Sequence, residues 1–345
     1  HAAQRAAHPD SLKFCAAGEP AAPPVGYPHI MPRISVLTTA YNAEPYIAQC
    51  IESVQAQTLD DWEMIIVDDA STDATVQVVQ RYRDDPRIRL VQNTQNLGPA
   101  AGRNRALEAA QGEWIAVLDA DDWYEPTRLE QLLHTAQELE VAIIYDFCRW
   151  ISASTGKPIG VFFSAHVPKP SAPVRLSPAQ AVQAHLALQP MIRRALIMQA
   201  NLRYREDITL GEDYLFQTLV TIEAGGCGVL PKPLYNYRRH ASSTYLRKFF
   251  DLSQPQKVYA TLFAHPKVRA DRALQRVLRR DYRRIMLARA YPQFTMALKQ
   301  RDWRKAWEVY RTAPFVTTQL IRSLPAALWR RLRGESTTYN WEGSL

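Results

Sequence analysis

Three aspartates crowd the end of a predicted buried strand in the segment AVLDADDW, at Asp119, Asp121 and Asp122. Asp119 and Asp121 flank the small Ala120, and residues i and i+2 of an extended chain point the same way, so both carboxylates can reach one ligand. Hard divalent cations take oxygen ligands and bind through one or two carboxylates together with substrate phosphates. The segment thus fits a metal that bridges the protein to a diphosphate, although an isolated Asp-x-Asp is more often a polar turn capping the next helix.

A second acidic pair, Glu212 and Asp213, opens the segment LGEDYLFQTLVTIEAGG. Its apolar period predicts a helix that Gly225 and Gly226 would end. A carboxylate at this place can take the proton of a hydroxyl group while that group attacks. The helix dipole also stabilises acidic side chains at a helix N-terminus. From the residues alone, the interpretation that Glu212 and Asp213 only stabilise the start of the helix is favoured.

Five short, β-branched runs are candidate strands between Arg33 and Tyr145: RISVLT, EMIIV, RIRLV, WIAVL and VAIIY. They alternate with segments of helical period, which predicts an α/β fold with a mostly parallel sheet covered on both faces. In such sheets ligands bind beyond the carboxyl ends of the strands, near a switch in strand order. The polar residues that follow these ends are Thr38, Thr39, Tyr41, Asp68, Asp69, Asp119 and Asp121. We therefore expect them to meet at one edge.

The helices between these strands show clear signals. The first has Pro45 near its start and an apolar stripe at Ile47, Cys50, Ile51 and Val54. For the second, Ser71 and Asp73 are natural N-caps, and Val76, Val79 and Tyr82 form the stripe. From Phe147 to Leu210 the pattern is irregular apart from a helix near AQAVQAHLAL. From Gln256 onward we predict arginine-rich helices.

Composition narrows the class of protein. The 345 residues carry a net charge of +8 and four cysteines without CxxC spacing, which argues against a disulfide scaffold or zinc site and favours a reducing cytoplasm. No run is apolar enough to span a bilayer. The basic balance suggests nucleic acid, but no compact aromatic and basic motif supports that partner. Residues 1–30, rich in Ala and Pro, are predicted to be disordered.

Several ordered motifs resemble glycosyltransferase family 2 with the GT-A fold: SVLTTAYNAEPYIAQCIESVQAQTLDDWEMIIVDDASTDAT, NLGPAAGRNRALEAAQGEWIAVLDADD and LGEDYLF. The resemblance covers about Pro32 to His240 and points to bacterial exopolysaccharide (succinoglycan-type) enzymes. It implies a Rossmann-like, mostly parallel central sheet flanked by helices, with a helical C-terminal extension. The implied divisions are a catalytic domain over 31–250, with a nucleotide-binding half at 31–122 and an acceptor-binding half at 123–250, and a basic helical region at 251–345.

The resemblance also implies roles for single residues. For nucleotide-sugar binding these are Thr39, Tyr41, Glu44, Asp69, Arg103, Asn104, Asp119, Ala120 and Arg238. Within that set, Asp69 would contact uracil, while Arg103 and Asn104 would contact the nucleotide or its phosphates. The implied metal ligands, for Mn²⁺ or Mg²⁺, are Asp121, Asp119 and His240. Asp213 would be the catalytic base, with Glu212 as its neighbour or substitute. Asp122 would have only a structural role, as a helix cap.

The implied activity is inverting, metal-dependent transfer of a hexose from a nucleotide sugar, with UDP favoured, to a glycan or lipid-linked acceptor in cell-surface polysaccharide assembly. One alternative is a non-catalytic nucleotide-sugar-binding module. Another is a dinucleotide-binding oxidoreductase. The loop TTAYNAE argues against it, because this loop lacks the GxGxxG motif of dinucleotide-binding proteins.

The arginine-rich helices have two interpretations. One is contact with an anionic membrane, which would make this cytoplasmic protein peripheral at the inner face of the cell membrane. The other, which is favoured, is packing on the catalytic domain with a basic face exposed to solvent. A final helix beginning near Pro325 would be short for stable anchoring.

Overall fold

The structure, a computed structural model, describes residues 32–163, 168–186, 189–240 and 249–320. The predictions for residues 1–30 and for the helix near Pro325 lie outside the described residues. No helix in the described part of the chain has the length and apolar character needed to cross a membrane.

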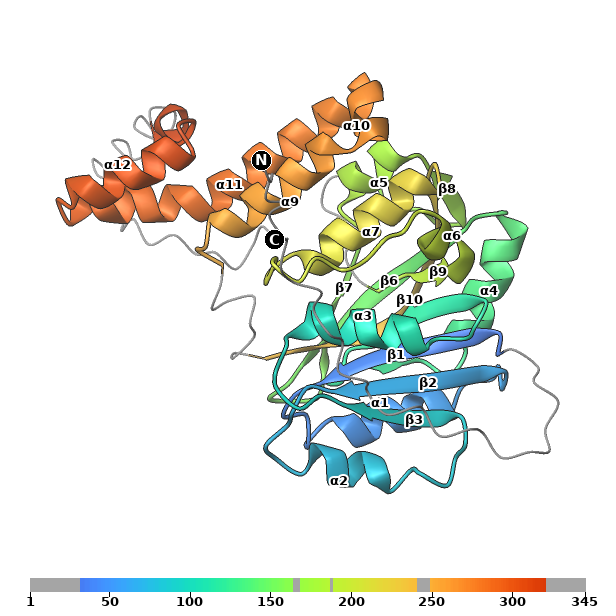
Figure 1. The fold of residues 1–345 in the computed structure, drawn as a ribbon. Coiled ribbons are helices and arrows are strands. Elements are labelled where there is room, and N and C mark those ends of the chain that lie inside the picture. The colour runs from blue at the N-terminus through green and yellow to red at the C-terminus, as the bar shows by residue number, and fades with distance from the viewer. Residues whose placement is uncertain (1–31, 164–167, 187–188, 241–248, 321–345) are drawn as a thin grey trace, which may run out of the picture. The chain divides into compact units, whose positions relative to one another are not determined.

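Within the described residues, ten strands form one sheet (Figure 1). The strands are β1 (Ile34–Ala40), β2 (Trp62–Asp68), β3 (Ile88–Gln92), β4 (Trp114–Val117), β5 (Trp123–Tyr124), β6 (Ile143–Ser152), β7 (Pro158–Phe162), β8 (Val174–Leu176), β9 (Met191–Arg193) and β10 (Cys227–Arg239). Their order is β3-β2-β1-β4-β9-β6-β10-β5, with β7 added to β6 and β8 to β10. All five strands predicted from the sequence are present.

Strand direction decides where polar residues gather. β3, β2, β1 and β4 are parallel, and β6 is parallel to β10, whereas β9 runs antiparallel between β4 and β6. The chain moves outward from β1 to β3 and returns to place β4 on the other side of β1. This reversal is the switch point expected to form a ligand-binding crevice at the carboxyl ends of the strands.

Helices cover both faces of the sheet (Figure 1). They are α1 (Ile47–Gln55), α2 (Thr75–Gln80), α3 (Pro99–Ala109), α4 (Arg128–Glu138), α5 (Pro178–Ala184), α6 (Arg194–Gln199), α7 (Glu212–Glu223), α9 (Ser253–Ala264), α10 (Pro266–Ala270), α11 (Arg272–Lys299) and α12 (Trp303–Thr312). α1 and α4 share one apolar cluster with the sheet, and α3 and α7 share another. The mostly parallel sheet flanked by helices and the helical C-terminal region are thus confirmed.

The first predicted helix matches α1, whose predicted apolar stripe is fully buried. The second was predicted less well. α2 begins at Thr75 and its N-cap position is Ala74, so neither Ser71 nor Asp73 is the N-cap, although Asp73 accepts hydrogen bonds from the amide and hydroxyl of Thr75 at the start of the helix. Its buried face is Thr75, Val78 and Val79, so placing Val76 in the stripe was wrong.

The irregular region from Phe147 to Leu210 proves to contain most of β6, together with β7, β8, β9 and α6. Strands of three to five residues carry too few alternations to give a periodic signal. Their pairing with long β6 and β10 stabilises them, which is tertiary information.

Candidate active site

The acidic turn after β4 is fastened to β10 through Asp122. This side chain is buried, and it accepts hydrogen bonds from the Tyr235 hydroxyl at 2.8 Å and from the Arg238 amide at 2.7 Å. Burial raises the pKa of Asp122 well above its usual range, and the neighbouring carboxylates of Asp121 and Asp119 raise it further. Asp122 therefore ties two elements together and does not cap a helix.

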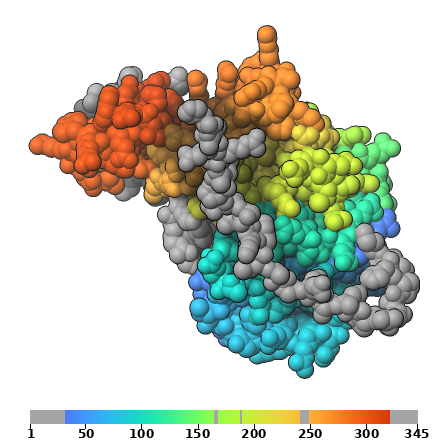
Figure 2. All heavy atoms as spheres, viewed as in Figure 1, coloured from blue at the N-terminus to red at the C-terminus, as the bar shows by residue number. Residues whose placement is uncertain are grey.

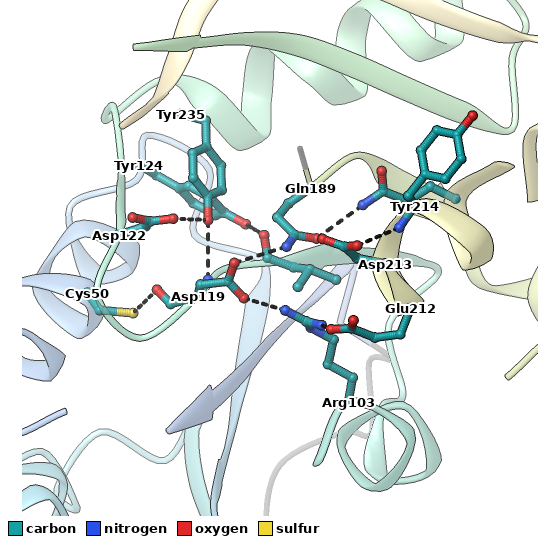
Figure 3. Close-up of polar contacts among 12 residues, drawn as sticks. Cys50, Arg103, Asp119, Asp122, Tyr124, Gln189, Glu212, Asp213, Tyr214 and Tyr235 are labelled. Carbon is teal, nitrogen blue, oxygen red and sulfur yellow. Dashed lines mark hydrogen bonds and ion pairs between the residues drawn. The ribbon is translucent and has the colours of Figure 1, made fainter. Parts of the chain in front are cut away.

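Asp119 points the opposite way, toward α3 and α7 (Figure 3). Its Oδ1 accepts from Arg103 Nη2 at 2.8 Å, and its Oδ2 accepts from Gln189 Nε2 at 3.0 Å. The buried Arg103 also donates from Nη1 to Glu212 Oε1 at 3.0 Å. One guanidinium thereby connects the turn after β4 with the first residue of α7.

Burial and neighbouring charges have opposing effects on the pKa values of Arg103 and Glu212. Burial lowers the pKa of Arg103, but the carboxylates of Asp119 and Glu212 more than offset this and hold the guanidinium charged. Burial raises the pKa of Glu212, and Asp213 raises it further, while Arg103 opposes both. Glu212 is thus an ion-pair partner with little access to solvent.

Asp213 is more accessible than Glu212. It lies half-buried at the start of α7, and its Oδ1 accepts a hydrogen bond of 2.6 Å from the amide of Tyr214. α7 begins after Gly211, which has φ +90°, a conformation that side-chain-bearing residues rarely adopt. Figure 3 shows both acids of α7 facing the cluster around Asp119.

Asp121 and His240 meet on the other side of the acidic turn. His240 Nε2 lies 3.3 Å from Asp121 Oδ2, yet this nitrogen has no hydrogen-bond partner among the described residues. Two ligand atoms each about 2.1 Å from one octahedral ion lie about 3 Å apart, so this spacing suits two neighbouring ligands of a metal. A carboxylate with an imidazole is also a donor set that Mn²⁺ accepts.

Arg238 holds this pair in place. Its guanidinium lies over the rings of Tyr46 and Trp123, with centroids 4.9 and 4.7 Å away, and its Nε donates to the Asp121 carbonyl at 2.9 Å. The His240 ring packs on Tyr46, with centroids 5.0 Å apart. The contacts of Arg238 therefore fix the conformation of the acidic turn beside Asp121 and His240.

The predicted third ligand, Asp119, does not join that pair. Both of its carboxylate oxygens are engaged with Arg103 and Gln189. Accordingly, no group of three or more His, Cys, Asp or Glu side chains suited to a metal exists among the described residues. Water and substrate phosphate would have to supply the remaining positions, as is common for Mg²⁺.

The loop after β1 lies at the same edge of the sheet. The amide of Glu44 donates to Asp73, and its carboxylate accepts from the Ala74 amide at 3.2 Å. Tyr41 is half exposed, and Thr39 packs against the start of α3 at Gly102. Ala120, in contrast, is buried in the core cluster beneath the acidic turn.

Asp69 fastens the loop that precedes α3. Its oxygens accept from the amides of Leu97 at 2.9 Å and Gly98 at 2.7 Å, and from Asn93 Nδ2 at 2.7 Å. An ionised carboxylate offers about four acceptor sites. Three are used here, which leaves one for the base contact that the resemblance implies.

Asn104 is used differently from its predicted role. Its amide group donates to the Tyr204 carbonyl and to Glu206, and its carbonyl oxygen accepts from the Tyr204 amide at 2.9 Å. These bonds fix the segment before α7 and leave the side chain buried. The predicted nucleotide contact of Asn104 has no support in this geometry.

Two residues of the site had no signal in the sequence. Gln189 bonds Asp119, and its carbonyl accepts from Arg128 Nη2 at 2.7 Å. The Tyr235 hydroxyl, besides binding Asp122, accepts a 3.3 Å hydrogen bond from the Asp119 amide. A lone Gln in an irregular segment and a Tyr in a long strand carry no motif, so only their tertiary contacts reveal them.

Comparison with known proteins identifies the class. Residues 35–165 match the model of the family described as Glycosyl transferase family 2, so the chain carries a glycosyltransferase domain of family 2. The succinoglycan biosynthesis protein ExoO of Rhizobium meliloti (strain 1021) is 29% identical over 307 residues, which are 87% of each chain. The resemblance to exopolysaccharide enzymes of this family is thereby confirmed.

Two further similarities bear on length and fold. EpsH of Bacillus subtilis (strain 168) is 32% identical over 227 residues, which are 64% of this chain and 65% of EpsH, so the match spans just under two thirds of that relative. The crystal structure of Staphylococcus aureus TarS 1-349 in complex with UDP-GlcNAc superposes with a TM-score of 0.67, covering 89% of this chain and 94% of that one. At 18% identity, this likeness concerns the fold.

Proposed function

We propose that this protein transfers a hexose from a nucleotide sugar, with a UDP-hexose as donor, to a glycan or lipid-linked acceptor in cell-surface polysaccharide assembly. The observation that carries the proposal is the Arg103 bridge from Asp119 to Glu212, because it brings the strand-end acids and the acids of α7 to one place. Further support comes from ExoO, named for succinoglycan biosynthesis, and from TarS, solved with UDP-GlcNAc.

In the proposed reaction, Asp213 takes the proton of the acceptor hydroxyl as its oxygen bonds to the anomeric carbon of the sugar. The bond from that carbon to the diphosphate oxygen breaks, and the nucleoside diphosphate leaves with the electron pair. Entry opposite the leaving group inverts the configuration. Asp213 suits this role better than Glu212, because Glu212 is buried in its ion pair with Arg103.

A divalent cation, Mn²⁺ or Mg²⁺, is part of this proposal, with Asp121 and His240 as the residues that would hold it. When bound, such an ion stabilises the charge of a departing diphosphate. Arg238 keeps the turn and the imidazole oriented through its contacts with Tyr46 and the Asp121 carbonyl.

A thermal-shift screen tests this function. UDP- and GDP-sugars are added with and without Mn²⁺, and we expect a UDP-hexose to raise the melting temperature most when the metal is present. A protein that no nucleotide sugar stabilises would contradict the proposal. A non-catalytic binding module remains the alternative, and it would show the same stabilisation without releasing nucleoside diphosphate in the presence of any acceptor.

Membrane contact belongs to the proposal through α12, the red helix at one end of the helical region (Figures 1 and 2). Trp303 and Trp307 lie one turn apart with about two thirds of their surfaces exposed, 68% and 60%. Arg304 lies between them in the sequence, and Arg311 lies one turn after Trp307. Exposed tryptophans beside arginines suit an anionic membrane surface. Replacing both tryptophans with serine should reduce flotation with anionic liposomes, and equal flotation of both forms would remove this role.

A further inference from the structure

Helix α7, which begins with Glu212 and Asp213, is enclosed on two sides. Phe216 and Val220 pack toward the sheet. Leu215, Leu219 and Ile222 pack in a separate cluster with Val258, Leu262, Leu274 and Leu278 of α9 and α11. In Figure 1 the yellow α7 accordingly lies between the sheet and the orange helices. The C-terminal helices are therefore direct neighbours of the helix that carries the proposed base.

Two buried polar side chains from these helices bond the chain on either side of the acids. On the N-terminal side, Gln254 of α9 accepts a hydrogen bond of 2.9 Å from the Thr209 amide. On the C-terminal side, Asp281 of α11 accepts one of 2.8 Å from the hydroxyl of Tyr214. Gln254 and Asp281 are each only 6% exposed. The Thr209–Tyr214 segment is thus held at both ends.

Tyr214 links the two regions most directly. Its amide donates to the Asp213 carboxylate, and its hydroxyl donates to Asp281. Arg284 Nη2 holds Asp281 Oδ1 at 2.6 Å, and Asp281 Oδ2, which accepts from Tyr214, also accepts from the hydroxyl of Tyr259. A shift of Asp281 would therefore move Tyr214, and with it the hydrogen-bond donor that orients Asp213.

We infer that Asp281 and Gln254 are positioning residues for the proposed base, which act on it through their hydrogen bonds to Tyr214 and Thr209. This inference rests on the proposed function of Asp213. Its physical basis is that proton transfer requires a base within hydrogen-bond reach of the acceptor, so misplacement by about 1 Å can cost up to about a hundredfold in rate.

The competing interpretation is that this network only stabilises the packing of the helices. A matched pair of variants separates the two, because Tyr214 and Tyr259 donate to the same oxygen of Asp281 from different helices. Tyr214→Phe frees α7 from Asp281. Tyr259→Phe removes the bond from α9 to that oxygen, together with a 3.5 Å contact to the Tyr214 hydroxyl. It leaves the bond between Tyr214 and Asp281 in place, because Arg284 still holds the other oxygen of Asp281.

For Tyr214→Phe we expect the kcat for release of UDP in the presence of acceptor to fall about tenfold, with the Kd for UDP unchanged within twofold. For Tyr259→Phe we expect kcat to stay within twofold of wild type, although the melting temperatures of both variants fall similarly. Equal effects of the two variants on kcat, or no effect of either, would overturn the inference.

Hydrogen exchange measured on the same proteins needs no activity. Tyr214→Phe should speed exchange of the amides of residue 214 and Leu215, which are hydrogen-bonded at the start of α7, and Tyr259→Phe should leave them protected as in wild type. Equal protection in both variants would contradict the positioning role even if the enzyme is active. An inactive wild type with the expected exchange pattern would instead refute the proposed function while supporting the link between α11 and α7.

Discussion

Arg103 and Glu212 are 109 residues apart in the sequence and form an ion pair of 3.0 Å in the buried centre of the site. Arg103 uses its other terminal nitrogen for Asp119, so the three residues form a chain from the turn after β4 to α7. The pairing places the acidic cluster of the nucleotide side next to the proposed base.

Replacing Arg103 with methionine should destabilise the protein strongly. It leaves two carboxylates without their cation, and breaking a buried pair typically costs about 3–5 kcal/mol. The exposed pair of Arg203 and Glu108 offers a control, because Arg203→Met should cost no more than about 1 kcal/mol. Urea unfolding measures both, and comparable losses would show that the Arg103 bridge is no stronger than a surface pair.

Removing the metal should weaken nucleotide binding through Asp121. We expect EDTA to raise the Kd of wild type for UDP about tenfold or more in calorimetric titration. Asp121→Asn should bind UDP equally weakly with and without Mn²⁺, because an amide is a poorer ligand than a carboxylate. Asp84→Asn, at a fully exposed acid, is the control. If Asp121→Asn keeps the full response to Mn²⁺, this metal site is wrong.

The close approach of α3 to β1 leaves no room for a side chain at Gly102. A Cβ at this position would lie 2.7 Å from Thr39 Cγ2. Alanine normally stabilises a helix by about 1 kcal/mol relative to glycine, but overpacking costs about 1–3 kcal/mol, so Gly102→Ala should be destabilising. Adding Thr39→Ser removes the opposing methyl group and should restore stability. A single variant more stable than wild type in urea would exclude the close contact.

Ionisation of Asp85 should make the free energy of unfolding of this protein depend on pH. Hydrogen bonds from Arg87 lower the pKa of Asp85 to about 2. A depressed pKa stabilises the fold above the unfolded value of about 3.9, and this stability is lost as the pH falls toward 2. Because Arg87 is about one third exposed, we expect Asp85→Asn to cost roughly 1 kcal/mol at pH 7.

That cost should shrink markedly at pH 3, as measured by urea unfolding at both pH values. The adjacent Asp84→Asn serves as a control, because its side chain is 96% exposed and its variant should behave like wild type throughout. A cost for Asp85→Asn that stays constant between pH 7 and pH 3 would show that ionisation of Asp85 is not its source.

The sequence predicted the nucleotide-side half of the fold well for a physical reason. Long, continuous apolar runs alternate there with helical periods, and parallel strands carry their polar ends to one edge by geometry alone. The meeting of Asp121 at the end of that half with His240, which lies far beyond it in the sequence, followed only from the family resemblance. No periodic pattern relates positions so far apart.

The rest of the site depends on contacts that local patterns do not encode. Gln189 reaches Asp119 from an irregular segment, and Asn104 turns away from the nucleotide side to hold Tyr204. Asp119 was predicted as a metal ligand because of its spacing from Asp121. The side chains of neighbouring elements, chiefly Arg103, instead turn its carboxylate toward α7.

The central claim, that Asp213 is the base of a sugar transfer, is tested most directly by comparing Asp213→Asn with wild type in one assay. The best donor from the thermal-shift screen is supplied with glycan and lipid-linked acceptors, and UDP release is followed alongside the Kd for UDP. We predict that the variant retains the wild-type Kd within twofold and loses about 10²–10⁴-fold in rate, the usual contribution of a general base. An unchanged rate in Asp213→Asn would contradict the account.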